Sequence, residues 1–488
     1  MLLGLSQNLI HDSASRFERF AQEQCENIQI SGSYNTALIK DLDEVLAQNL
    51  GQMNYVQLLP IQGYSTSVLL SGENLLVYAP TGSGKTAAFL IPAIELVIRH
   101  NKNEGRRADH PLVLILGNTN NLMLQTFKFA CAMAGYDPSE EVANTHVRIF
   151  NLFAGSGMSR MRNMMKIDHE IVIATCGGVL QAFMYQKLDL SNLKMLVIDE
   201  ADKMVDESRG FGYEVAQIFS HVPKDVIVAE FSATFCEKNN QIQLSDLDKK
   251  LFRKKIPVSI SILPPRGYIT QRVIKKSERV AHIGNWTQAF NKDLSSLVRL
   301  IESDLNFHKM KKGGPYQKST VIFVERRITS NYLALFLQQQ GYDFEPVNSD
   351  YTVDDNERTI VHMTCGKIQG VVATNKIARG QDFSEVDHVI IYEMAQDFND
   401  YKHRIGRTGR MGKGGRATVM ISVNLDSAHI ISLVEFMIYH NQNLPQWLWN
   451  LYQKMKNMSQ EINSLSNSFC SATTEITGEE EDDVLDYS

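Results

Sequence analysis

The clearest chemical signal in the sequence is the stretch APTGSGKT, residues 79–86, which lies between a strand-forming run and an apolar helical pattern. A glycine-rich turn in that context points successive backbone N–H groups at phosphate oxygens. A lysine at the start of the helix neutralises the β- and γ-phosphates and a neighbouring hydroxyl reaches Mg²⁺, roles that we assign to Lys85 and Thr86. Such a turn can also merely cap a helix, but the strand and helix around it favour a nucleotide-binding P-loop. The other loop residues expected at the nucleotide are Ala79, Thr81, Gly82, Ser83 and Gly84.

Three acidic residues, Asp199, Glu200 and Asp202, follow a second apolar run in the stretch VIDEADKM. Burying carboxylates without a partner is costly, so a cation should lie beside them. Next to a P-loop, Asp199 would hold Mg²⁺ and Glu200 would orient and activate an attacking water. A strand that simply ends in solvent is the alternative, and the presence of a P-loop favours the catalytic interpretation.

Four cationic residues are interleaved with two glycines in the stretch HRIGRTGR, residues 403–410. Planar guanidinium groups bind phosphate oxygens in pairs, and a stretch with two glycines makes a poor solvated helix. The stretch therefore predicts an anion site, with an ordinary basic loop or an RNA-facing patch as the alternative.

The elements that must position these residues follow an α/β pattern. Short apolar runs alternate with amphipathic helical stretches, which indicates parallel sheets wrapped by helices. The runs expected to form strands are residues 74–79, 112–117, 147–153, 170–175, 195–200 and 226–233, then 320–325, 370–375, 388–393 and 417–422. The stretch SILPPRGYITQ between the two series has adjacent prolines and a glycine, which is typical of a linker. The two series predict two α/β domains.

The length of 488 residues agrees with two domains and a tail. With 43% hydrophobic and 21% charged residues, the composition excludes wholesale disorder. We expect an N-terminal extension at 1–33, domains at 34–260 and 272–450, a linker at 261–271, and a disordered tail at 451–488. The tail carries eight acidic and two basic residues, which accounts for the whole net charge of −6. Because the body is neutral, any binding of nucleic acid needs locally placed donors.

The six cysteines lie scattered along the chain, without the CxxC spacing of a metal or redox site. They are typical of reduced thiols in a cytosolic or nuclear protein. No apolar run approaches the length that spans a bilayer, and the N-terminus lacks the basic start and apolar centre of a signal peptide. We therefore expect neither export nor membrane insertion.

The motifs above stand in the order found in DEAD-box ATP-dependent RNA helicases, and the chain resembles that family from about Tyr34 to Trp449. The letters DEAD are residues 199–202 themselves. The resemblance implies two RecA-like domains, each a mostly parallel sheet flanked by helices, with ATP, Mg²⁺ and RNA in the cleft between them. It also makes Arg407 and Arg410 arginine fingers that reach the nucleotide from the second domain.

The same resemblance assigns residues to the adenine, the ribose and the coupling between domains. The stretch NYVQLLPIQ resembles the adenine-reading Q motif, with Tyr55 and Gln62 as its aromatic residue and glutamine. Leu58 and Leu59 replace two of the motif's usual residues. Asp382 takes the ribose contact. The residues that would couple hydrolysis to unwinding and one domain to the other are Asp202, Ser232, Thr234, His403 and Arg404.

The RNA-facing motifs depart from the family's pattern. NTNNL replaces PTREL and has Asn120 in place of its arginine, while TCGG replaces TPGR and has Gly178 in place of its arginine. The QxxR motif falls on Val353 and Asn356, with Arg358 as a substitute after a small shift. The residues that are expected to contact RNA are Thr119, Gly155, Thr175, Gly177, Arg326 and Thr374. Losing phosphate donors should weaken RNA binding without affecting the hydrolysis groups themselves.

The sequence therefore predicts a monomeric RNA-stimulated ATPase that binds single-stranded or short duplex RNA and unwinds it locally or remodels RNPs. The missing arginines leave open whether RNA binding is merely weaker or needs an activating protein partner. Two other classes remain, a noncatalytic RNP scaffold and a DNA translocase of the same superfamily. The stretches NLPQWLWN and RTGRMGKGG resemble Vasa and its relatives. We expect a cytoplasmic protein, with RNP granules and the nucleus as alternatives.

Overall fold

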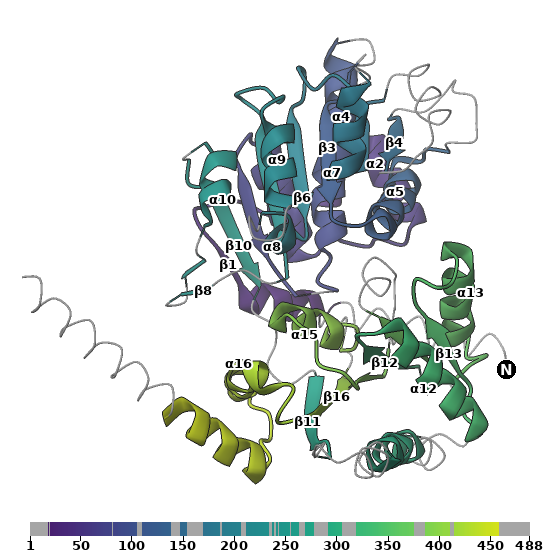
Figure 1. The fold of residues 1–488 in the computed structure, drawn as a ribbon. Coiled ribbons are helices and arrows are strands. Elements are labelled where there is room, and N and C mark those ends of the chain that lie inside the picture. Colours follow the sequence, from purple (N-terminus) through teal and green to yellow (C-terminus); the bar gives the residue numbers. More distant parts are fainter. Residues whose placement is uncertain are drawn as a thin grey trace, which may run out of the picture.

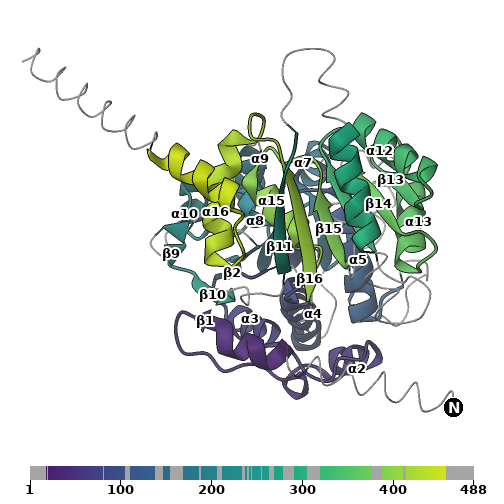
Figure 2. The same cartoon turned by 90° about the horizontal axis from the view of Figure 1, so that it is seen from below.

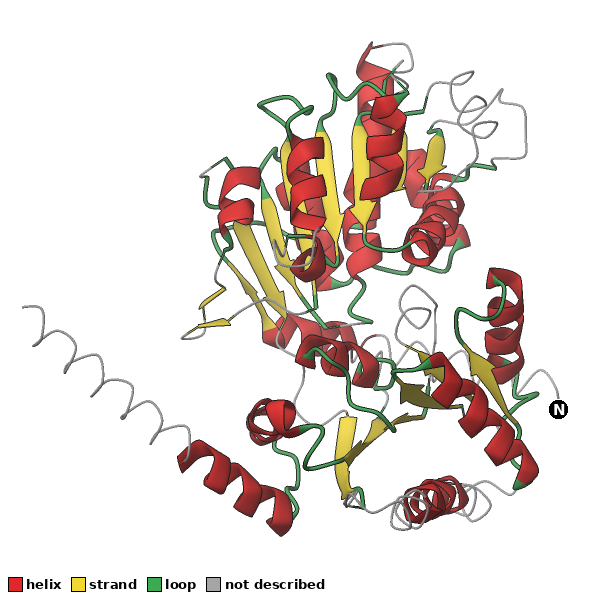
Figure 3. Ribbon diagram, in the orientation of Figure 1, coloured by secondary structure: helices red, strands yellow, loops and turns green. Residues whose placement is uncertain are grey.

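Two α/β domains lie one above the other in the computed structural model (Figure 1), and helices flank the sheet of each (Figure 3). The structure describes residues 18, 20–80, 82–104, 110–137, 147–153, 169–185, 188–205, 211–233, 237–238, 241–242, 244–253, 255–262, 269–277, 291–304, 319–374, 386–409 and 414–457. Within these ranges, no helix combines the length and the apolar character needed to cross a membrane.

The first domain is built on an eight-stranded sheet in the order β1-β10-β2-β7-β6-β3-β5-β4. Its strands are β1 (Ile28–Ile30), β2 (Leu75–Tyr78), β3 (Val113–Gly117), β4 (Ile149–Leu152), β5 (Ile171–Thr175), β6 (Met195–Asp199), β7 (Ile227–Ser232) and β10 (Val258–Ile262). Strand β1 is antiparallel to β10, and the other neighbouring pairs are parallel. Because parallel strands end at the same edge of a sheet, the segments that follow β2, β3, β5, β6 and β7 meet there.

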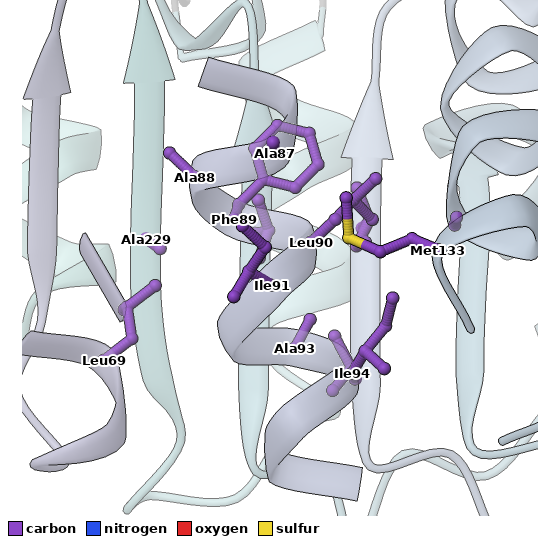
Figure 4. Packing of buried hydrophobic residues seen from close by; sticks show 14 of the residues in the cluster. Leu69, Ala87, Ala88, Phe89, Leu90, Ile91, Ala93, Ile94, Met133 and Ala229 are labelled. Atoms are coloured by element: carbon purple, nitrogen blue, oxygen red, sulfur yellow. The ribbon is translucent and has the colours of Figure 1, made fainter. Parts of the chain in front are cut away.

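Helices cover both faces of the first sheet. They are α2 (Glu44–Gln52), α3 (Pro60–Leu70), α4 (Lys85–Glu104), α5 (Asn120–Ala134), α7 (Cys176–Met184), α8 (Ala201–Met204), α9 (Phe211–Phe219) and α10 (Asp246–Leu251), with a 3₁₀ turn η1 (Ile39–Asp41) and a small hairpin of β8 (Glu237–Lys238) and β9 (Gln241–Ile242). Successive strand residues face opposite sides, so Val77 packs in one core cluster and Leu76 in the other. Phe89 and Ile94 of α4 lie in the first of these clusters (Figure 4).

The second domain is built on a six-stranded sheet in the order β11-β16-β15-β12-β14-β13, in which each neighbouring pair is parallel. Its elements are β11 (Ile269–Lys275), β12 (Thr320–Val324), β13 (Phe344–Val347), β14 (Gly370–Thr374), β15 (His388–Ile391), β16 (Gly415–Ile421), α12 (Arg327–Gln339), α13 (Val353–Thr364), α15 (Phe398–Ile405) and α16 (Ser427–Tyr439). Figures 1 and 2 both place α15 and α16 at one end of this sheet and α12 and α13 at the other.

All ten runs that the sequence predicts as strands form strands, namely β2 to β7, β12 and β14 to β16. The expected boundaries need correction. Strand β1 lies in the expected N-terminal extension but pairs with the first sheet, and β10 and β11 extend into the expected linker from either side. At the other end, Leu451 and Tyr452 of the expected tail pack on the core of the second domain. These corrections share one cause. Each segment looks like a connection in its own sequence, but it is ordered by backbone pairing with, or burial against, a part of the chain that is distant in sequence.

Candidate active site at the domain boundary

The P-loop turn lies between β2 and α4, as the sequence predicts. Gly82 and Gly84 have φ of 79° and 96°, a left-handed conformation that glycine adopts without steric cost. The ammonium of Lys85 donates a hydrogen bond to the carbonyl of Ala79 at 2.6 Å. The lysine charge is therefore held at the turn itself, where phosphates would bind. Thr81 lies outside the described residues.

The glutamine of the Q motif, Gln62, is buried against the P-loop. Its Oε1 accepts a hydrogen bond from the backbone N–H of Leu59 at 2.8 Å, which caps the first turn of α3. A Cβ atom added to Gly84 would lie 2.8 Å from Gln62 Nε2, so the two segments touch. Tyr55 is partly buried against the same core, and burial raises the pKa of its hydroxyl. The fold thus brings the Q motif and the P-loop together.

The acidic cluster lies where β6 ends and the short helix α8 begins. Asp199 is the last residue of β6 and is only 6% exposed. Glu200 has φ 52° and ψ 47°, a left-handed conformation that is strained for a residue with a side chain. The Oδ1 of Asp199 accepts the backbone N–H of Glu200 at 2.9 Å. Strain of this kind persists only where the surroundings hold it, and it is concentrated at functional sites.

Asp199 is a carboxyl group that lacks sufficient positive charge beside it. Burial raises the pKa of Asp199 above its ordinary value, the charge of Glu200 raises it further, and Lys85 lowers it. In the part of the chain that the structure describes, no three His, Cys, Asp or Glu side chains cluster so as to hold a metal ion. Mg²⁺ commonly uses one or two protein groups and completes its shell with water and phosphate oxygens. The buried carboxyl group of Asp199, which lies near Lys85, therefore has the chemistry of an Mg²⁺ ligand beside a nucleotide.

Glu200 is held by two donors from different elements. Its Oε2 accepts hydrogen bonds from Lys203 Nζ at 3.0 Å and from Asn118 Nδ2 at 2.9 Å. Burial alone would raise the pKa of Glu200, but the charges of Lys203 and His403 bring it down to about 2. The carboxylate is therefore ionised at neutral pH.

Sequence reasoning did not identify Asn118 as a neighbour of Glu200. The signal that could have found it is the register of two parallel strands. Strands β3 and β6 pair so that Leu116 lies opposite Ile198, which sets positions 118 and 200 opposite each other just beyond the strand ends. A register of this kind is a property of the sheet and cannot be read from either strand alone.

Asp202 connects the first domain to the second. Its Oδ1 accepts a hydrogen bond from Ser232 Oγ, at the end of β7. Its Oδ2 lies 3.6 Å from Nε2 of His403, on α15 of the second domain. Burial would raise the pKa of Asp202, but His403, Lys203 and the Ser232 hydroxyl lower it well below its usual range. Three of the residues expected to couple the domains, Asp202, Ser232 and His403, are therefore in contact, while Thr234 lies outside the described residues.

His403 and Arg404 are both expected to couple the domains, but their side chains have different surroundings in the structure. His403 is buried at the boundary, and burial together with the charge of Lys203 lowers its pKa. Arg404 donates hydrogen bonds to the backbone carbonyl of Glu393 at 2.7 Å and to the carboxylate of Glu325, both in the second domain. Its guanidinium carbon also lies 5.4 Å from the centroid of the Phe323 ring. These contacts fasten α15 to its own sheet.

The other arginines of this stretch and the ribose contact are only partly described. Arg407 is buried directly after α15, and its backbone N–H donates to the carbonyl of Arg404 at 3.1 Å. Arg410 and Asp382 lie outside the described residues.

The residues expected to contact RNA lie at the carboxyl ends of strands in both sheets. Thr119 follows β3 and caps α5, where its side chain accepts the backbone N–H of Leu122 at 3.3 Å. Thr175 ends β5, Gly177 lies in the first turn of α7 and Thr374 ends β14. Arg326 is exposed at the start of α12, and Gly155 lies outside the described residues.

Packing occupies two of the three positions where the sequence lacks a family arginine, 178 and 356, whereas Asn120 is exposed. A Cβ atom added to Gly178 would lie 2.5 Å from the backbone oxygen of Leu152, so α7 approaches β4 too closely for a side chain. Asn356 is buried and donates to the carbonyls of Asn348 and Thr352, at 3.1 and 2.9 Å. Arg358 forms a 2.8 Å ion pair with Asp355 on the surface of α13. Asn356 therefore holds the fold and does not take the place of a phosphate-binding arginine.

Two family models match the chain. The DEAD/DEAH box helicase model matches residues 59–242, and the helicase conserved C-terminal domain matches residues 307–412. The probable ATP-dependent RNA helicase DDX4 of Macaca fascicularis is 28% identical over 418 residues, which cover 84% of this chain and 52% of that protein. The ATP-dependent RNA helicase vasa of Drosophila melanogaster is 28% identical over 413 residues, which cover 84% of this chain and 56% of that protein. The chain thus spans about half the length of the curated relatives that it matches.

Solved structures show the same fold. Mss116p bound to single-stranded RNA and AMP-PNP is 20% identical, with a TM-score of 0.65 over 90% of this chain and 87% of that chain. Dbp5 of S. cerevisiae bound to RNA and ADP BeF3 is 22% identical, with a TM-score of 0.62 over 85% of this chain and 96% of that chain. The expected architecture of two RecA-like domains is confirmed by these matches and by the two sheets described above.

Proposed function

Because the chain belongs to the DEAD/DEAH box helicase family, we propose that it is an ATP-dependent RNA helicase that hydrolyses ATP to ADP and phosphate. Hydrolysis would be coupled to RNA binding and to local duplex unwinding or RNP remodelling. The observation that carries the proposal is the meeting of the acidic cluster with α15, where Asp202 and His403 lie 3.6 Å apart across the two domains.

In this proposal ATP binds between the Q motif and the P-loop. Gln62 reads the adenine beside Tyr55, Asp382 binds the ribose, and the loop N–H groups bind the phosphates. Lys85 exchanges its bond to the Ala79 carbonyl for bonds to phosphate oxygens. The close approach of Gln62 to Gly84 supports a single site for base and phosphates.

Mg²⁺ would be held by Asp199 and Thr86, partly through water, and when bound it supplies positive charge to the phosphates. The burial of Asp199 supports this assignment, since its carboxylate needs a cation. Glu200, which is ionised at neutral pH, orients and activates the attacking water. Arg407 and Arg410 complete the site from the second domain and stabilise the charge that develops on the γ-phosphate.

Coupling to RNA follows from the position of the site at the domain boundary. Closure of the domains brings the arginines of the second domain to the nucleotide and joins the RNA-facing residues of both sheets. ATP and RNA then favour the same closed state, so each should increase the affinity for the other. The contacts of Asp202 with Ser232 and His403 support this route, because they link the acidic cluster to β7 and α15.

A slow, partner-dependent ATPase or a noncatalytic RNP scaffold is the second candidate function. It is favoured by the loss of phosphate donors, since Asn120 and Gly178 stand where the family has arginines. A protein partner that supplies or orders RNA contacts would compensate for this loss.

Steady-state ATP hydrolysis with and without single-stranded RNA tests the proposal, with Lys85→Ala as the blank. Strong stimulation by RNA supports an RNA-dependent ATPase. A hydrolysis rate that exceeds the Lys85→Ala rate but does not change when RNA is added supports dependence on a protein partner. A rate equal to that of Lys85→Ala supports the noncatalytic scaffold. A titration of RNA affinity against salt completes the test, because the slope reports the number of phosphate contacts.

We also propose a cytoplasmic location that includes RNP granules. Cys25, Cys131, Cys176 and Cys365 are free thiols among the described residues, which supports a reducing compartment. Fluorescence microscopy of a tagged full-length chain checks this location, and a tagged protein confined to the nucleus would contradict it.

A further inference from the structure

The amide of Asn118 donates a hydrogen bond from Nδ2 to Oε2 of Glu200 at 2.9 Å. The bond joins two neighbouring parallel strands just beyond their ends, since Asn118 follows β3 and Glu200 follows β6. The register of the two strands sets the two positions side by side. The contact therefore joins two positions that the sheet itself brings together.

The geometry at Glu200 leaves one carboxylate oxygen for another partner. Asn118 and Lys203 both donate to Oε2, the first from a residue far before Glu200 in the sequence and the second from a residue shortly after it. Among the described residues, Oε1 accepts no hydrogen bond. Two donors on one oxygen restrict rotation of the carboxylate, so the other oxygen keeps a constant direction. A general base needs this kind of fixed direction toward its water.

The contact belongs to this chain and not to the family pattern. Asn118 opens the stretch NTNNL, which stands where the family has PTREL, so it occupies the position of a proline. Proline has no side-chain donor and could not make this bond. The same short stretch lacks the family's arginine at Asn120. Asparagine in place of proline at position 118 thus adds a hydrogen-bond donor near the nucleotide site. Asparagine in place of arginine at position 120 removes a donor that would face RNA.

Asn118 also adjoins the RNA-facing side of the first domain. The next residue, Thr119, caps α5 through its side chain and is one of the expected RNA contacts. A ligand that orders the Thr119 turn would order Asn118 with it, because the two residues share a peptide bond. Asn118 alone therefore connects the turn at Thr119 to the carboxylate of Glu200, through one peptide bond and one hydrogen bond.

We propose that Asn118 is a positioning residue for ATP hydrolysis, which orients Glu200 and transmits the state of the RNA-facing turn to it. This inference rests on the proposed ATPase function. Asn118 acts through the direction of the Glu200 carboxylate.

Steady-state kinetics of the full-length chain test the inference with two variants of Asn118. Asn118→Ala removes the donor, and we expect kcat with RNA to fall about tenfold while KM for ATP stays within about twofold. Asn118→Asp keeps the size of the side chain but faces Glu200 with a second carboxylate, so its kcat should fall further than that of Asn118→Ala. A residue with a merely structural role would show the reverse order, because the Asp side chain fills the same space.

Asn331→Ala is the matched control, since it removes an amide-to-carboxylate bond of 3.2 Å to Asp350 in the second domain, together with the bond of 2.7 Å that Asn331 Oδ1 accepts from Asn348. Its kcat should match that of the wild type, and thermal melts should show that all three variants are folded. Wild-type hydrolysis with an unchanged rate for Asn118→Ala would overturn this inference and leave the proposed function standing. Wild-type hydrolysis no faster than that of Lys85→Ala would overturn both.

Discussion

His403 and Asp202 face each other across the domain boundary, with Nε2 and Oδ2 3.6 Å apart and both side chains about 5% exposed. They come from α15 of the second domain and the start of α8 in the first. Asp202 is held in addition by the Ser232 hydroxyl, so its direction toward His403 is set inside the first domain. The pair is therefore a contact that exists only when the domains are close together.

Replacing His403 with Ala should lower RNA-stimulated ATP turnover about tenfold, because coupling between sites is commonly worth about 1–3 kcal/mol. ATP affinity of the first domain should change little, since the P-loop is untouched. Steady-state kinetics and nucleotide binding measure the two effects. Asp202→Asn and the double variant complete a cycle in which the two losses should be less than additive. Fully additive losses would show that the two residues act independently.

Arg404→Met should destabilise the second domain and not merely uncouple it. Arg404 is buried and donates to the Glu393 carbonyl and the Glu325 carboxylate, and breaking such a pair costs about 3 kcal/mol or more. Urea unfolding measures this loss. Arg358→Met is the control, because its ion pair with Asp355 is exposed and worth at most about 1 kcal/mol. Equal stability of the two variants would contradict the assignment.

Asn120→Arg should strengthen RNA binding, whereas Gly178→Arg should not, although both restore a family arginine. Asn120 is exposed at the start of α5, so a new guanidinium there adds one phosphate contact and steepens the salt slope by about 0.7. A side chain at Gly178 would press on the Leu152 backbone and cost about 1–3 kcal/mol of stability. RNA titrations at several salt concentrations and thermal melts measure both effects. A Gly178→Arg chain of wild-type stability would show that α7 can move away from β4.

Glu230→Gln should stabilise the first domain at pH 8 more than at pH 5. Glu230 is fully buried in β7, and burial followed by the charge of Asp248 raises its pKa well above 4.5. Between 4.5 and the raised value, the unfolded chain releases this proton and the folded chain keeps it. The free energy of unfolding therefore falls as pH rises through that window, by at most about 1.4 kcal/mol per pH unit.

Denaturant unfolding of Glu230→Gln and the wild type at both pH values checks this prediction. The neutral amide has no proton to lose, so the difference between the two proteins should grow from pH 5 to pH 8. A difference that stays constant between these pH values would assign the effect to packing alone.

Local chemistry was enough to predict the ten central strands, the P-loop and the acidic turn. Each buried parallel strand is a nearly continuous apolar run, and the glycines and charges that follow β2 and β6 are the residue types that a phosphate and its Mg²⁺ require. Strands at the edges of the sheets were missed because their own sequences are not continuous apolar runs. Strand β13 contains Pro346, which an edge tolerates, and β1 and β11 are ordered by pairing with β10 and β16.

The tertiary structure decided which side chains meet. The sequence identifies Asn118, Glu200, Arg404 and Gly178 as residue types in motifs, but it does not say that Asn118 reaches Glu200 or that Arg404 turns into its own domain. Those contacts depend on the register between strands and on how closely helices approach a sheet. Both are set by the packing of segments that lie far apart in the chain, so no local pattern records them.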